Sequence, residues 1–201
     1  MTTRRTLLLG AASFALPLGL GGCFDRPYYE KNPEQKQFLD ELGRIAKAAL
    51  GSGNPLQMEH AAQQCLQLAY KASPMKEWHG VLRKIEGTSQ DVTVTIEIGP
   101  QVTLYSFNDS MLKHTERLRD LFSRTGPRPM GLSREAVAAL KAFRLNDQVM
   151  ITGRVGDIAG SGLSFAELKG MFGRSEFDYR QFLQAPQFIA SIESLAPPKR
   201  S

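Results

Sequence analysis

The chain of 201 residues contains few of the residues on which several protein classes depend. It has two cysteines, which do not form a Cys-x-x-Cys pair and cannot build a disulfide framework. Its three histidines lie too far apart along the chain for two of them to share a helical turn, which leaves little for a zinc site. A composition of 42% hydrophobic and 22% charged residues is typical of a globular protein. It argues against a disordered chain and against a protein with several membrane spans.

The common local motifs of enzymes are also missing. There is no Gly-x-Ser-x-Gly, no His-Glu-x-x-His, and no Gly-Lys-Ser/Thr after the glycine-rich stretch 156–162. Cys65 lies on the apolar stripe of a predicted helix, without a neighbouring cation to lower its pKa, so we expect a buried and inert thiol. The sequence therefore predicts a protein that is not an enzyme, with no metal, no cofactor and no small-molecule substrate. An enzyme remains the alternative if folding brings His79 or His114 next to carboxylates.

The N-terminus has the order of a signal peptide. Arg4 and Arg5 are the only charges in the first 22 residues, and residues 6–22 are uncharged and rich in Leu and Ala. A basic start, an apolar stretch and small residues before the cleavage point are typical of a secretory signal. Seventeen uncharged residues are too few for a good transmembrane helix. We therefore expect residues 1–22 to be removed.

Two short patterns resemble specific export signals. Leu20, Gly21, Gly22 and Cys23 resemble the lipobox of bacterial lipoproteins, which implies a diacylglycerol and a further acyl chain on Cys23. Residues 3–8, Thr-Arg-Arg-Thr-Leu-Leu, resemble a twin-arginine signal, and an ordinary secretory signal is the alternative. The resemblance implies a lipid-anchored envelope protein that faces the periplasm.

The residues after the anchor bear on its location and its charge. Phe24 rather than Asp follows the cysteine, which favours the outer membrane over the inner membrane. Without Arg4 and Arg5, the chain has 23 basic and 20 acidic residues, a formal charge of +3. This is a mildly basic protein, without the strong positive field that non-specific nucleic-acid binding requires.

Apolar spacing divides the mature chain into a helical part and a strand part. Residues 23–33, with two prolines and no periodicity, predict a tether, and residues 34–73 carry two apolar stripes of helical period that predict a helical hairpin. From residue 76 the period changes to two. Five strands are expected, with helices in the long connection before the fourth, over residues 77–85, 92–98, 101–107, 148–155 and 188–192.

The strand order predicts an α+β protein with a five-stranded OB-like β-barrel over residues 76–195, helical insertions, and a polar tail over 196–201. Trp78-x-Gly80, followed by Asn146-Asp147-x-Val149-x-x-x-Gly153-x-Val155, resembles bacterial OB-fold proteins of the tRNA-anticodon-domain-like type. This resemblance implies an OB-fold and a role in binding.

The connection between the last two strands, residues 157–187, is rich in aromatic residues. In OB-folds this connection forms one wall of the ligand groove. We therefore predict a binding face made of Trp78, Arg83, Tyr105, Arg154, Phe165, Phe172 and Tyr179. The alternative is that a short helix containing Phe165, Leu168 and Phe172 plugs one end of the barrel. An exported lipoprotein would bind an envelope protein or glycan on such a face. A single-stranded nucleic-acid binder is the alternative if the signal peptide is not used.

Overall fold

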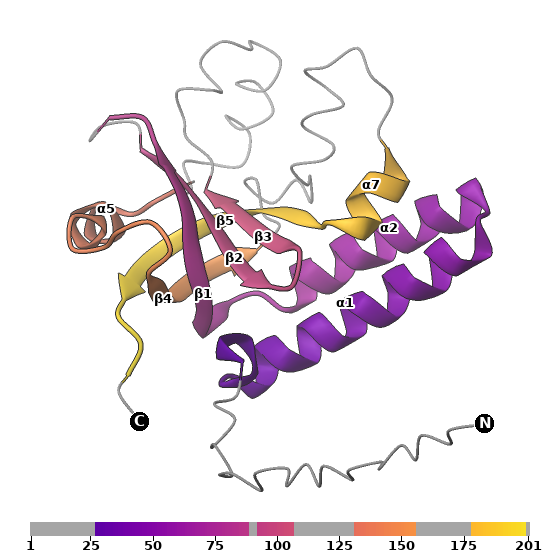
Figure 1. Ribbon diagram of the computed structural model, residues 1–201, viewed down its shortest axis with the longest axis horizontal. Helices are drawn as coiled ribbons and strands as arrows, with labels where there is room; N and C mark the ends of the chain where they lie inside the picture. The colour runs from indigo at the N-terminus through magenta and orange to yellow at the C-terminus, as the bar shows by residue number, and fades with distance from the viewer. Residues whose placement is uncertain (1–26, 89–91, 107–130, 156–177, 200–201) are drawn as a thin grey trace, which may run out of the picture.

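The computed structural model describes residues 27–88, 92–106, 131–155 and 178–199 (Figure 1). The predicted signal peptide, with Arg4, Arg5, Leu20, Gly21 and Gly22, lies outside the described residues, as do Cys23, residues 107–130 of the long connection before the fourth strand, and Phe165 and Phe172 in the aromatic connection.

The first two long helices are α1 (Pro33–Ser52) and α2 (Pro55–Lys71). Each follows an asparagine whose side chain caps the first turn and begins with a proline, since proline has no N–H to leave unpaired there. Between them Gly53 adopts the left-handed conformation (φ 65°), which glycine reaches without steric strain. The helix α2 therefore runs back along α1, as Figure 1 shows.

In the described part of the chain, five strands close into a barrel in the order β1-β2-β3-β5-β4. Their bounds are β1 Met75–Glu86, β2 Thr93–Gly99, β3 Val102–Ser106, β4 Gln148–Val155 and β5 Gln187–Ala196. Neighbouring strands are antiparallel except β3 and β5, which are parallel. The prediction of an α+β protein with two N-terminal helices and a five-stranded barrel is confirmed, and the barrel is consistent with an OB-like one.

Three shorter helices complete the described elements. The 3-10 helix η1 (Tyr28–Glu30) precedes α1, so part of the tether expected at 23–33 is folded against the domain. The helix α5 (Arg134–Leu140) follows β3 and precedes β4 in the sequence, and it packs on β5. It begins after Ser133, whose hydroxyl caps its first turn. The helix α7 (Tyr179–Gln184) lies between β4 and β5 and packs against α2 and α1. Figure 1 shows α5 on the far side of the barrel from α1.

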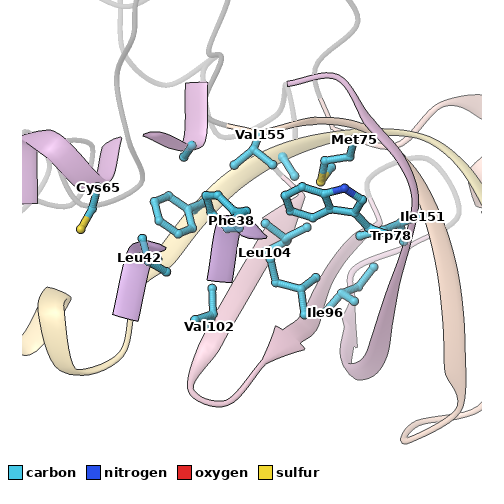
Figure 2. Close-up of a cluster of buried hydrophobic side chains, with 14 of the residues drawn as sticks. Phe38, Leu42, Cys65, Met75, Trp78, Ile96, Val102, Leu104, Ile151 and Val155 are labelled. Atoms are coloured by element: carbon cyan, nitrogen blue, oxygen red, sulfur yellow. The ribbon is translucent and has the colours of Figure 1, made fainter. Parts of the chain in front are cut away.

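The core is continuous from the barrel interior into the two long helices. Phe38 of α1 packs against Trp78 of β1, with ring centroids 5.1 Å apart, and against Phe188 of β5 at 6.0 Å. Figure 2 shows Phe38 between the helical side chains Leu42 and Cys65 and the barrel side chains. Because α1 inserts a large aromatic residue into this core, the helices belong to the same folded unit as the barrel.

Candidate functional site

The outer face of three adjacent strands carries Arg83 and Tyr105, two of the five described residues that were expected to bind. In the strand register Lys84 lies opposite Thr95, and Thr95 lies opposite Tyr105, so one row crosses β1, β2 and β3. A register shift between Leu82 and Lys84 marks a bulge at Arg83, next to this row. We call Arg83, Lys84, Thr95, Glu97 and Tyr105 the β1–β2–β3 face.

The charged groups at one end of this face are already paired. Arg83 Nε lies 2.7 Å from Glu97 Oε2, and Arg83 Nη1 donates to Asn146 Oδ1 at 2.7 Å. The Tyr28 hydroxyl donates to Glu97 Oε1 at 3.3 Å. Burial raises the pKa of Tyr28, and Glu97 raises it further, whereas Arg83 lowers it. The Arg83 guanidinium is therefore held in a fixed orientation and is not a free cation.

Arg154 and Tyr179 do not join this face. Arg83 contacts Asn146, just before β4, whereas Arg154 lies near the other end of β4, opposite Ser191 and 3.8 Å from Glu193. Tyr179 begins α7 and is partly buried against the hydrophobic core. The structure thus brings Arg83 and Tyr105 to one face and places the other two elsewhere.

Trp78 is not a platform for stacking, because its side chain is 1% exposed and lies in the core beside Phe38 (Figure 2). The reason is that successive side chains of a strand point to opposite faces. Trp78, Gly80 and Leu82 occupy every second position of β1 and so share one face, and all three are buried. A side-chain type alone cannot tell the inner face from the outer face. Trp78 lies four positions before the apolar Leu82 and therefore on the same face of the strand, and this spacing could have placed it on the inner face.

No three His, Cys, Asp or Glu residues in the described part of the chain lie close enough together to hold a metal ion. His79 Nδ1 is buried without a hydrogen-bond partner, and burial lowers the pKa of His79, as does Lys31, while Glu77 raises it. His114, the other histidine considered for catalysis, lies outside the described residues.

Cys65 is fully buried, as expected, and burial raises its pKa to about 12. At neutral pH the side chain is therefore a neutral thiol, since a group with this pKa loses its proton only in strong base. The arrangement around Cys65 does not activate a nucleophile.

The described residues form hollows beside the helices. One, of about 870 Å³, opens between α1, the end of α2 and the start of β1. Another, of about 1250 Å³, lies between α1, the β2–β3 turn and the segment that joins α7 to β5. Sequence reasoning predicted neither, because each is formed by elements that are distant along the chain.

No family model, curated protein or solved structure matches the chain. None of the helices within the described residues is both long enough and apolar enough to cross a membrane.

Proposed function

We propose that this protein is a lipid-anchored lipoprotein of the bacterial envelope, whose OB-like barrel binds a protein or glycan partner without catalysis. The observation that carries the proposal is the closed barrel with its parallel β3–β5 pair, on which β1, β2 and β3 present one continuous row of side chains outward. Barrels of this strand order commonly bind ligands on the face of their second and third strands.

The composition of the β1–β2–β3 face suits a partner that is bound through polar and aromatic contacts. Lys84 is exposed, Thr95 and Tyr105 are partly buried, and the ion pair of Arg83 and Glu97 borders them. Partly buried tyrosine with threonine beside it offers a flat surface with hydroxyl groups, which both proteins and sugars can use. The Arg83 guanidinium is engaged by Glu97 and Asn146, and the Lys84 ammonium lies 2.8 Å from Glu86, so both described cations of the face are already paired, which argues against nucleic-acid phosphates as its ligand.

The proposed anchor restricts where this face can act. Tyr28 is tied to Glu97 of β2 by its hydroxyl, and only five residue steps separate Tyr28 from Cys23. That length of chain spans at most about 18 Å even when fully extended. A lipid on Cys23 would therefore hold the β1–β2 side of the barrel close to the membrane surface. This supports a partner that is itself part of the envelope.

The anchor is tested by Cys23→Ser, which we expect to move the protein from the membrane fraction to the soluble fraction of the cells. The mass of the protein extracted from its own membranes is the direct measurement. It should lack residues 1–22 and carry the mass of acyl chains. A chain that keeps its N-terminus and has no lipid would overturn the proposed location.

The binding face is tested by a photo-crosslinking amino acid at position 84, with position 64, on the exposed side of α2, as the matched control. Both side chains are exposed, so neither replacement should disturb folding. We expect a discrete crosslinked species in intact cells from position 84 alone, or co-sedimentation with purified cell-wall glycan that a bulky residue at position 84 abolishes. Equal results at both positions would contradict the assignment of the face.

A further inference from the structure

The hollow between α1, α2 and β1 has the size and lining of a small-molecule site. Its volume is about 870 Å³, within the range of pockets that hold small ligands. Leu68, Ala72 and Pro74 supply apolar surface above the buried rings of Phe38 and Trp78, and charged side chains of α1 and lysines near the end of α2 and in β1 surround it. We call this hollow the α1–α2–β1 groove.

Two hydrogen-bonding groups of the lining have no partner. Trp78 Nε1 and Ser73 Oγ are both buried, and neither forms a hydrogen bond within the described residues. The indole N–H is a donor only, so an acceptor is what it lacks. A buried donor without a partner destabilises a protein by about 1–3 kcal/mol, and native proteins contain few of them. Because neighbouring side chains cover both atoms, a ligand oxygen supplies the missing acceptor once the lining of the groove moves aside.

The charges of the groove differ between its two walls. On α1, Lys36 pairs with Asp40 at 2.6 Å and Arg44 pairs with Glu41 at 2.6 Å, so these four charges cancel.

On the other wall Lys71 and Lys76 flank Ser73 in sequence, and neither forms an ion pair with any residue that the structure describes. Glu34, at the start of α1, is the remaining charged residue of the lining. The wall that contains the partnerless Ser73 hydroxyl is thus the cationic one.

From these contacts we propose that the α1–α2–β1 groove binds an organic carboxylate. The carboxylate lies between Lys71 and Lys76, accepts a hydrogen bond from Ser73, and offers an oxygen toward the Trp78 indole. The apolar body of the ligand packs along Leu68 and Pro74. This site is separate from the β1–β2–β3 face, so it does not depend on the function proposed for that face.

The experiment uses the single tryptophan of the chain as its reporter, because Trp78 lines the groove. The full-length protein, solubilised in detergent, is titrated with 4-phenylbutyrate. The matched probes are 4-phenylbutanol, which lacks the charge, and 4-phenylbutylammonium, which reverses it. We expect a saturable change in Trp78 emission with the carboxylate and a much weaker response to the other two. Equilibrium dialysis of the carboxylate checks for binding that leaves the emission unchanged.

Variants then assign the carboxylate to its proposed position. Lys71→Gln and Lys76→Gln should each raise the Kd for 4-phenylbutyrate about five- to tenfold, since each removes a charge-assisted contact. Lys141→Gln, an exposed lysine on the far side of the barrel, should leave the Kd unchanged. All three lysines are exposed, so the variants should fold as the parent does. The proposal would be overturned if 4-phenylbutanol bound as tightly as 4-phenylbutyrate, or if all three lysine variants changed the Kd equally. The absence of saturable binding in equilibrium dialysis would overturn it as well.

Discussion

The side-chain amide of Gln35 forms the hydrogen bonds that a neighbouring strand would otherwise make with the backbone of His79. Gln35 Oε1 accepts from His79 N at 2.7 Å, and Gln35 Nε2 donates to His79 O at 2.6 Å and to Ile98 O at 2.7 Å. The pairing of β1 with β2 runs from Glu86 only as far as Val81, so the backbone of His79 would otherwise lack these bonds. Gln35 thus joins the first turn of α1 to the edge where two strands separate.

We expect Gln35→Leu to lower the free energy of unfolding by about 3 kcal/mol, because it leaves buried backbone groups of β1 and β2 without partners. Urea denaturation followed by circular dichroism measures the change. The matched control is Gln64→Leu, on the exposed side of α2, where the change should stay within about 0.5 kcal/mol. Equal stability of the two variants would show that the Gln35 hydrogen bonds do not hold α1 to the barrel.

The irregular pairing of β4 with β5, whose register shifts between Thr152 and Gly153, leaves no room for a side chain at Gly153. A Cβ there would collide with the backbone carbonyl oxygen of Ser191 and lie 3.0 Å from Ile192 Cα. Backbone atoms cannot turn aside as a side chain can, so Gly153→Ala should destabilise the protein by about 2 kcal/mol or more. Gly43→Ala in α1 is the matched control, because no atom lies within 4 Å of its added Cβ. That control should stabilise the protein by about 0.5–1 kcal/mol. Thermal denaturation followed by circular dichroism measures both variants.

Phe38→Ala should detach α1 from the barrel. Phe38 is 3% exposed and contacts both Trp78 and Phe188, and truncation of a buried phenylalanine costs about 3–5 kcal/mol. The emission of Trp78 should shift to longer wavelength as water reaches its ring. Leu56→Ala, at a side chain that is 74% exposed, provides the comparison and should change neither the emission nor the midpoint in urea. An unshifted emission in Phe38→Ala would mean that α1 does not cover Trp78.

Cys65 should stay unreactive while the protein is folded. In a Cys23→Ser background it is the only thiol, and we expect it to react with an aromatic disulfide reagent at pH 8 only after unfolding. Because burial raises its pKa from 9.0 to about 12, the folded state favours the neutral thiol. Its contribution to stability is complete below pH 9 and declines as the pH rises toward 12. Cys65→Ala should weaken this alkaline loss of stability, and fast labelling of the native protein would contradict the burial.

The sequence alone was sufficient for the two long helices and the five strands of the barrel, although not for η1 or α7. Asparagine followed by proline at residues 32–33 and 54–55 begins each long helix, and the alternation of Val94, Ile96 and Ile98 places these side chains on the buried face of β2. These signals are local, because a cap or a pleat depends on residues within a few positions of one another. The signal-like N-terminus is also a local pattern, and its lipid remains a prediction.

Tertiary structure alone decided which polar and aromatic side chains are buried. The sequence around Gln35 does not indicate that its side chain will meet the point where β1 and β2 separate, because His79 at that point is 44 residues further along the chain. Trp78 could have stacked on a ligand or filled the core, and it fills the core because Phe38 of α1 meets it there. The groove beside Lys71 and Lys76 likewise exists only where α1, α2 and β1 converge. The periodicity of the sequence specifies which face of each helix or strand is apolar. What packs against that face depends on contacts between distant parts of the chain.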